Sequence, residues 1–316
     1  METAIVFTDG KAGHENQSKA LARGLGLEPK FISVRFKSKA HKVLSYLFDW
    51  LGIYTFALAA ERPILPTAKK VIGTGSGTFY FAKVAAKKLR GKVAVVLYPR
   101  GYRISTFDCV LAPSFDCPPC AANVIELEAN LVAADAAFYE QGSSAFAEHY
   151  AKVNGRQVEE NVRAVGVIIG GPNKCSSMSV GWLKKELDAI FGEGRGAQSG
   201  GKVFWVTTSR RTPPEIEALV DGYPWDYKLL YSRDHFNPIP AFVAHCRRLY
   251  VTAESTGMLS EACTSGTAEV RALDNLNPGP SKFRRFLENL TSDGYLNGSR
   301  KIDTASKFAQ AAKLLA

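Results

Sequence analysis

The sequence predicts an α/β protein made of two doubly wound halves. Short apolar runs rich in β-branched residues alternate with segments of helical period along nearly the whole chain. Strands of this kind are typical of a parallel sheet that is buried on both faces. The chain has 316 residues, which is room for two ordinary domains, and its apolar fraction of 46% is that of a soluble globular protein.

The first half contains six predicted strands and two clear helical patterns. One helical pattern follows the first strand and ends at Gly24 or Gly26, and the other fills residues 78–91. Residues 140–163 are polar with a helical pattern, and we interpret them as a connector. The predicted strands are residues 3–8, 30–36, 69–73, 92–98, 107–113 and 123–128.

The second half repeats the alternation without a sequence repeat. Ser179 is a predicted cap for a helix over 180–191, residues 192–202 are a predicted flexible surface loop, and Thr212–Glu215 reads as a capping box with proline at the first helical position. The two halves are therefore 1–155 and 156–316, with the last helix either in the second half or returning to the first. The predicted strands here are residues 163–171, 202–209, 226–232, 248–253 and 267–273.

Five loops that follow predicted strands are built alike, with Gly, Ser or Thr where a helix begins. Each loop is expected to present free backbone N–H groups to an anion. Ligands of doubly wound folds lie at the carboxyl ends of the strands, so a cleft between the two halves is the expected site. A tight turn between a strand and a helix explains the composition of any single loop equally well. The loops are residues 9–17, 73–78, 170–176, 207–213 and 252–261.

Two of these loops carry charged residues suited to a nucleotide. Arg210 and Arg211 follow Ser209, and a guanidinium can hold a diphosphate with two hydrogen bonds. Positive charge opposes the dipole at a helix start, which suggests an anionic ligand there. In the run from Thr252 to Glu261, helical geometry separates Glu261 from the apolar face, so it is either a surface carboxylate or a ligand-binding residue.

His14 and Asp9 are the candidate catalytic residues of the first loop. His14 follows Gly13 before the first predicted helix, and histidine can take up a proton near neutral pH. Asp9 could orient this loop or act as the base itself. The alternative for His14 is an ordinary polar residue at a helix start.

The composition of the chain limits the kinds of partner that are expected. Lys and Arg number 40 against 30 Asp and Glu, so an anionic partner is expected, and no nucleic-acid-binding motif is present. The six cysteines include a lone Cys117-Pro-Pro-Cys120, which favours structural thiols in a reducing compartment. Together with the absence of a signal-peptide pattern, this predicts a cytoplasmic protein. No Asp-x-Asp or helical His pair occurs, so no metal site is predicted.

Residues 37–65 pair five basic side chains with Leu, Tyr, Phe and Trp on a helical period. An amphipathic helix that lies on an anionic membrane surface has this composition. A helix packed on the first domain, or a lid, fits equally well. The sequence therefore leaves open whether this protein is peripheral on the cytoplasmic face of a membrane.

The order of these motifs resembles the mitochondrial-fission-Elm-like family of predicted GT-B glycosyltransferases. The resemblance runs from residue 8 to about 295, and TSRRTP and TAESTGMLSEA are its most specific parts. It implies two Rossmann-like domains that face each other across a cleft. It further implies an acceptor-side domain at 1–155 and a domain that binds a nucleotide sugar at 156–316.

The resemblance also implies roles for the candidate residues. His14 would face the acceptor, with Gly13, Gly75 and Ser76 on the same side, and Glu254 stands where the family has Asp. The nucleotide sugar is the co-substrate, and no further cofactor is implied. The donor nucleotide and its diphosphate would be bound by Gly170, Gly171, Ser209, Arg210, Arg211, Thr252, Ser255, Thr256, Gly257 and Glu261.

The sequence thus predicts a metal-independent hexosyltransferase type of enzyme acting on a membrane-associated or glycan acceptor. The alternative is a non-catalytic adaptor or membrane-interaction protein on the same scaffold, because a plant member of the family resembles an adaptor for mitochondrial fission. An NAD-dependent enzyme that uses GTGSGT (73–78) is disfavoured, because no acidic residue stands about 20 residues after the glycines.

Overall fold

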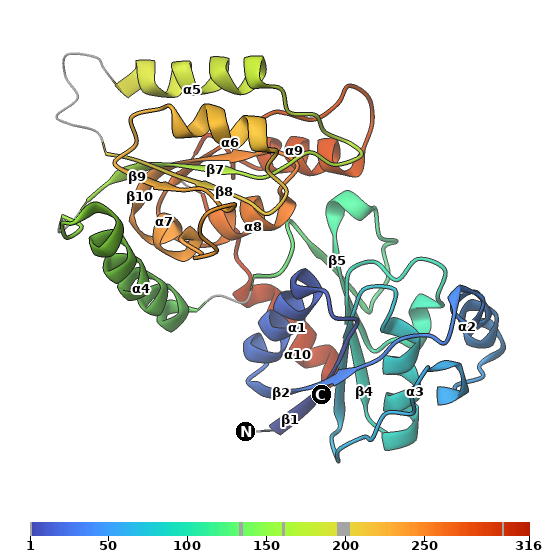
Figure 1. Ribbon diagram of the computed structural model, residues 1–316. Helices are drawn as coiled ribbons and strands as arrows, with labels where there is room; N and C mark the ends of the chain where they lie inside the picture. Colours follow the sequence, from blue (N-terminus) through green and yellow to red (C-terminus); the bar gives the residue numbers. More distant parts are fainter. Residues whose placement is uncertain (1, 133–134, 160–161, 195–202, 299) are drawn as a thin grey trace. The chain divides into compact units, whose positions relative to one another are not determined.

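A computed structural model describes residues 2–132, 135–159, 162–194, 203–298 and 300–316. The chain forms two compact units (Figure 1). The N-terminal unit is Met1–Ala133 with Asp303–Ala316, and the C-terminal unit is Ala134–Ile302. Each unit is a parallel sheet with helices on both faces, so the predicted α/β class is confirmed.

The N-terminal unit has a six-stranded sheet in the order β2-β1-β3-β4-β5-β6, with every neighbouring pair parallel. The chain leaves β1 toward β2 and then returns past β1 to β3. The strand order therefore reverses between β1 and β3, which makes this the ligand-binding edge of a doubly wound sheet. The strands are β1 (Glu2–Thr8), β2 (Leu27–Ser33), β3 (Lys70–Thr74), β4 (Lys92–Val96), β5 (Cys109–Pro113) and β6 (Val124–Leu127).

Alternation along the strands builds a core on each face of this sheet. Ile5 and Phe7 point toward α3, whereas Ala4 and Val6 point toward α1 and α10. Phe308 of α10 lies against Gly24 of α1, where a Cβ would come within 2.4 Å of the ring. The last helix therefore belongs to the N-terminal unit. The helices are α1 (Ala12–Gly24), α2 (Lys39–Leu51), α3 (Phe79–Leu89) and α10 (Ala305–Leu315), with the short 3-10 turns Phe56–Leu58, Ile104–Thr106 and Ser114–Asp116.

The C-terminal unit has a five-stranded parallel sheet in the order β11-β10-β7-β8-β9. Here the chain leaves β7 toward β8 and later returns past β7 to β10, so the strand order reverses between β7 and β10. The strands are β7 (Ala164–Ile169), β8 (Phe204–Thr208), β9 (Tyr227–Leu229), β10 (Cys246–Thr252) and β11 (Glu269–Leu273). The helices are α4 (Ala136–Asn154), α5 (Val180–Gly194), α6 (Pro214–Asp221), α7 (Ile239–His245), α8 (Thr256–Thr264) and α9 (Lys282–Ser292).

Helix α4 moves the division between the units away from the predicted position at 155. Its Phe146 is buried, with ring centroids 4.8 Å from Trp205 and 4.7 Å from Tyr227. The polar connector predicted over 140–163 is therefore mostly a helix whose aromatic side packs in the core of the C-terminal unit. Polar residues dominate its sequence because only one side of it is buried.

Strands at all the predicted places are present among the described residues, with β2 starting earlier than predicted because Leu27 pairs with Glu2. Ser179 does cap α5, since its Oγ accepts the Trp182 N–H at 3.2 Å. The predicted capping box is wrong: α6 begins at Pro214 behind Pro213, and no side chain caps it.

Two further sequence predictions concern loops and membranes. Most of the loop predicted at 192–202 lies outside the described residues, which stop at 194 and resume at 203. Among the described helices, none has the length and apolar content needed to cross a membrane.

Candidate functional site

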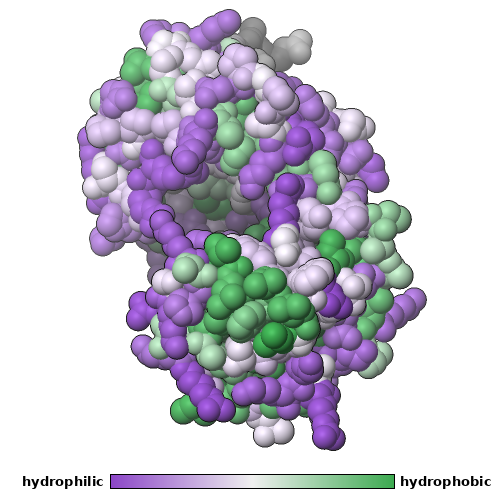
Figure 2. Space-filling model, turned by 90° about the vertical axis from the view of Figure 1, so that its right-hand side faces the viewer, coloured by the Kyte–Doolittle hydropathy of each residue, from purple (hydrophilic) through white to green (hydrophobic). Residues whose placement is uncertain are grey.

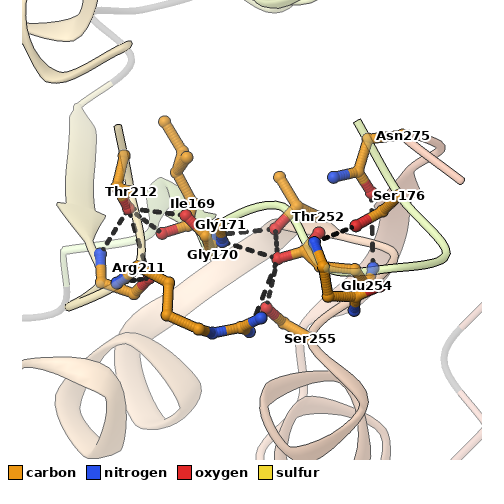
Figure 3. A network of polar contacts seen from close by, with 12 residues as sticks. Ile169, Gly170, Gly171, Ser176, Arg211, Thr212, Thr252, Glu254, Ser255 and Asn275 are labelled. Atoms are coloured by element: carbon orange, nitrogen blue, oxygen red, sulfur yellow. Dashed lines mark hydrogen bonds and ion pairs between the residues drawn. The ribbon is translucent and has the colours of Figure 1, made fainter. Parts of the chain in front are cut away.

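The C-terminal unit brings together the loops that follow three adjacent strands (Figure 3). Gly170 and Gly171 follow β7, Ser209 to Thr212 follow β8, and Glu254 and Ser255 follow β10. Because these strands are neighbours and parallel, their carboxyl ends meet at one edge of the sheet. Thr212, which does not cap α6, links two of the loops: its Oγ1 accepts the Ser209 N–H at 2.8 Å and donates to the Gly170 carbonyl at 2.6 Å.

The buried carboxylate of Glu254 lies at the centre of this edge. Its Oε1 accepts the Gly171 N–H at 2.8 Å, the Ser255 hydroxyl at 2.7 Å and the Thr252 hydroxyl at 3.1 Å. The Gly170 N–H donates to Thr252 Oγ1 at 2.8 Å. A Cβ at position 170 would lie 1.9 Å from Glu254 Oε1, so a larger residue there would displace this carboxylate. The expectation that both glycine N–H groups are free for an anion is therefore wrong.

Arg210 and Arg211 differ in their surroundings. The Arg211 guanidinium lies 4.0 Å from Glu254 Oε1, and its side chain is 45% exposed. Arg210 is exposed and lines a cavity of about 270 Å³. Positive charge that could attract an anionic ligand therefore lies beside the Glu254 carboxylate and in the adjacent cavity.

The cavity beside Arg210 has walls suited to a ring. Tyr231 and His235 stack with ring centroids 4.6 Å apart, and Met258 from α8 contributes an apolar side chain. Ligand sites generally combine apolar walls of this kind with a few polar groups. The lining residues are Thr207 to Arg211, Tyr231, His235 to Ile239 and Met258.

Helix α8 begins directly after this edge. Ser255 is its N-cap, but the Ser255 hydroxyl donates to Glu254 and makes no cap hydrogen bond. The N–H groups of the first turn, at Thr256 and Gly257, therefore lack side-chain capping and carry the positive end of the helix dipole.

Glu261 lies one and a half turns further along α8. The helix buries Leu259, Ala262 and Cys263. Glu261 is partly buried, and its Oε1 is shielded from solvent without a hydrogen-bond partner among the described residues. Burial raises the pKa of Glu261 to about 7. Tyr139 of α4 lies nearby: burial and, behind it, the charge of Glu261 raise the pKa of its phenol above the usual value. Sequence patterns did not indicate Tyr139, which precedes the segment interpreted as a connector.

Asp9 and His14 form a pair at the end of β1 in the N-terminal unit. Asp9 Oδ1 lies 2.9 Å from His14 Nδ1, and the Lys11 ammonium lies 3.0 Å from Asp9 Oδ2. Burial acts to raise the pKa of Asp9, but the hydrogen bonds and charges of Lys11 and His14 outweigh it and hold this pKa below its usual value. Asp9 is therefore ionised near neutral pH, and it orients the His14 ring.

The loop after β3 packs against this pair. Gly75 has φ of +82°, and a Cβ there would lie 2.2 Å from the His14 ring, so this position requires glycine. The next residue, Ser76, accepts a hydrogen bond from Lys42 Nζ of α2 at 2.8 Å. Space beside Gly13 is open. Asp9, His14, Gly75 and Ser76 thus lie together at the edge where β1 and β3 end, and Lys42 is an addition that loop motifs did not indicate.

Among the described residues, no group of three or more His, Cys, Asp or Glu is arranged to hold a metal ion. Cys117 and Cys120 are exposed free thiols.

The chain that carries these two strand-end sites can be assigned to a family. The profile of the family described as mitochondrial fission ELM1 matches residues 12–312. The chain belongs to this family. A comparison with curated proteins found no match.

Solved structures with a similar fold include a UDP-GlcNAc 2-epimerase and MurG. A UDP-GlcNAc 2-epimerase from Neisseria meningitidis bound to UDP-GlcNAc has a TM-score of 0.51 at 13% identity, covering 99% of this chain and 98% of that one. MurG from Acinetobacter baumannii has a TM-score of 0.46 at 11% identity, covering 100% and 92%. The family member described here therefore has the GT-B fold, with two Rossmann-like units.

Proposed function

We propose that this protein is a glycosyltransferase that moves a sugar from a nucleotide-sugar donor to an acceptor hydroxyl, without a metal ion. The C-terminal unit would bind the donor, and the N-terminal unit would hold the reacting hydroxyl. The observation that carries the proposal is the gathering of candidate residues where the strand order reverses, between β1 and β3 and between β7 and β10. Doubly wound folds bind their ligands at such positions.

The donor's diphosphate would lie beside Ser209, Arg210 and Arg211, at the start of α8. Arginine pairs with phosphate through two hydrogen bonds, and the uncapped first turn at Thr256 and Gly257 offers further donors. The strand-end residues would shape the floor of this site: Gly171, Thr252 and Ser255 contact Glu254, and Gly170 contacts Thr252.

Glu261 would hold the ribose hydroxyls. A buried carboxyl oxygen without a partner costs free energy in the unliganded protein, and a hydroxyl donor from a ligand removes that cost. The ring-lined cavity next to Arg210 offers space for another ring of the same ligand.

His14 would act as the general base. With Nδ1 held by Asp9, His14 Nε2 is left to take the proton of the acceptor hydroxyl while the bond between the sugar and the diphosphate breaks. Asp9 itself is the weaker candidate base, because its lowered pKa reduces its affinity for a proton. Arg210, Arg211 and the α8 dipole would stabilise the leaving diphosphate in place of a metal ion.

The acceptor would be a glycan or a molecule held at a membrane, with Gly13, Gly75 and Ser76 on its side of the site. The exposed Gly13, with open space beside it, and the partly exposed Ser76 leave room for it. We further propose that the protein works in the cytoplasm, peripherally on an anionic membrane surface that its excess of basic residues would attract.

One observation favours a second candidate, a non-catalytic adaptor. The Glu254 carboxylate already occupies the glycine N–H donor at the strand ends, where a catalytic site would be expected to leave donors for an anionic ligand. An adaptor would bind a partner or a membrane without turning over a nucleotide sugar.

Turnover separates the two candidates. The protein is incubated with a panel of UDP-, GDP-, ADP- and CMP-sugars and vesicles of total cell lipid, and the released nucleotide is measured. A transferase releases nucleotide, and His14→Ala slows release by about 10²- to 10⁴-fold, as expected for loss of a general base. The control Glu215→Ala changes an exposed side chain of α6, away from α2, and leaves the rate unaltered. Release that is equally fast with His14→Ala contradicts the proposed base.

A further inference from the structure

We propose that helix α2 of the N-terminal unit docks on an anionic lipid surface through Val43, Leu47, Trp50 and Leu51. These four residues, called the α2 stripe, are spaced so that they fall on one face of the helix. They are all exposed, at 67%, 50%, 68% and 53% respectively.

Helix α2 carries apolar side chains on two faces. A helix at the surface of a globular protein buries its apolar face and exposes its polar face. In α2, Leu44, Tyr46 and Phe48 pack against the core beside the buried Ser45 and Asp49. The stripe of large apolar residues lies on the other side of the helix and faces solvent. An apolar stripe on the outside of a folded unit marks an interaction surface.

Buried polar contacts fix the helix in this orientation. Asp49 Oδ1 lies 2.6 Å from the buried Lys83 ammonium, and Asp49 Oδ2 accepts the Arg103 N–H at 2.7 Å. The Ser45 and Tyr102 hydroxyls are hydrogen-bonded at 2.8 Å. If α2 turned its stripe inward, these contacts would break and leave a buried ammonium without its counter-charge. The exposure of the stripe is therefore held by the core of the unit.

Basic residues lie near both ends of α2. Lys37 and Lys39 are exposed at the start of α2, and the exposed Arg103 donates to the Trp50 carbonyl at 2.9 Å. Lys87 lies over the Tyr54 ring, 4.8 Å from its centroid. These cations complement anionic lipid headgroups, while lysine stems and tryptophan are suited to the boundary between headgroups and acyl chains.

Acidic residues do little to offset this charge. Asp49 is buried against Lys83, and the exposed Glu61 lies 3.9 Å from Arg35. Figure 2, which views the molecule from the side on which α2 lies in Figure 1, shows hydrophobic side chains gathered on the N-terminal unit with hydrophilic residues around them. The exposed apolar stripe, with basic residues near both ends of its helix, suits an anionic lipid surface.

Helix α2 also connects this surface to the Asp9–His14 site. Lys42, in the turn that carries the stripe, donates to Ser76 in the loop that packs against His14. If the proposed function holds, an acceptor held in the membrane would therefore reach His14 from the side of α2. This last step rests on the proposed function, whereas the docking itself does not.

Flotation with vesicles tests the docking. The full chain is mixed with vesicles of 70% phosphatidylcholine and 30% phosphatidylglycerol, or of phosphatidylcholine alone. We expect binding to the anionic vesicles that weakens in 0.5 M salt. Leu47→Glu should reduce the bound fraction at least about tenfold, because it adds charge to the stripe at the boundary. Val153→Glu, at an exposed valine of α4 in the other unit, should bind like the parent protein. Circular dichroism establishes that both variants are folded.

Tryptophan fluorescence locates the contact. Brominated phosphatidylcholine included in the anionic vesicles should quench the emission of the parent protein, and Trp50→Phe should abolish this quenching while the protein still floats. The proposal is overturned if the parent protein binds neither kind of vesicle, or if Leu47→Glu binds the anionic vesicles as well as the parent does. It is also overturned if the only effect of Leu47→Glu is to convert a dimer to a monomer in sedimentation velocity. Nucleotide binding measured on the same samples keeps the two proposals apart, since either can fail while the other holds.

Discussion

The Glu254 carboxylate accepts the backbone N–H of Gly171 at 2.8 Å, at the edge where β7 and β10 end. This edge is where a doubly wound sheet usually offers N–H groups to an anionic ligand. Here a side chain of the protein holds one of those donors. A phosphate would therefore have to bind beside this carboxylate, at the Arg210 cavity and the first turn of α8, rather than on the glycines.

The charge of Glu254 should oppose nucleotide binding. Glu254→Gln retains an oxygen that can accept the Gly171 N–H but removes a negative charge from the site. We expect the affinity for a nucleoside diphosphate to rise by about 1 kcal/mol or roughly fivefold, as a like charge is removed from partly buried surroundings. Isothermal titration calorimetry measures it, with Glu215→Gln on the exposed side of α6 as the control. An affinity that falls would mean that Glu254 itself binds the ligand.

Nucleotide binding should depend on the protonation of Glu261. Burial raises the pKa of Glu261 to about 7 in the unliganded protein, so the carboxyl is largely protonated below that pH. Ribose hydroxyls donate to the ionised form, and binding then has to release a proton. The affinity should therefore rise up to tenfold per unit as the pH increases toward about 7, and level off above it.

Calorimetry at pH 5.5 to 8.5 in two buffers of different ionisation heat measures both the affinity and the released proton. In Glu261→Gln the pH dependence should disappear and the affinity should stay low throughout. A parent protein with flat affinity across this range would exclude Glu261 from the ligand contacts.

Gly75 should be essential for the position of His14. Gly75→Ala adds a Cβ that would lie 2.2 Å from the ring, in addition to the strain of alanine at φ of +82°. Gly26→Ala is a matched control, because its φ is +67° and no atom lies within 4 Å of the added Cβ. Both variants should lose about 1–2 kcal/mol of stability from the backbone. Only Gly75→Ala should shift the His14 ring resonances in NMR spectra; equal shifts in both would argue against the contact.

The Asp49–Lys83 pair should matter greatly for stability. Asp49→Asn leaves the buried Lys83 ammonium without a counter-charge, and removing one partner of a buried pair costs about 3–5 kcal/mol. Asp188→Asn breaks an exposed pair with Lys184 of equal length, 2.6 Å, and should change stability far less. Urea unfolding monitored by circular dichroism compares the two variants. Similar unfolding midpoints would mean that the Lys83 ammonium is not held in the core by Asp49.

Most of the fold could be predicted from local patterns. Buried parallel strands are short apolar runs, and such runs at Ile5–Phe7 or Val167–Ile169 stand out from the polar helices between them. The cap at Ser179 could be predicted for the same reason, since its partner is only three residues away. The family resemblance stated from the strand-end motifs agrees with the family match over residues 12–312.

The parts that sequence patterns missed depend on contacts between distant residues. Thr212 looks like a helix cap, but its hydroxyl is used by Gly170, more than forty positions away in the chain. Glu254 lies next to Ser255 in a loop that looks open to an anion, yet its side chain folds back onto Gly171. The exposed stripe of α2 follows from the buried pair with Lys83, which helical periodicity alone does not reveal.

The central claim is that the C-terminal unit binds a nucleotide sugar, and calorimetric titration tests it most directly. The protein is titrated with UDP-, GDP-, ADP- and CMP-sugars up to millimolar concentration, alongside Glu261→Ala and the control Glu215→Ala. The account predicts saturable binding of at least one of these compounds, at least tenfold weaker in Glu261→Ala and unchanged in Glu215→Ala. If none of them binds the parent protein, or if Glu261→Ala binds with the parent's affinity, the account is contradicted.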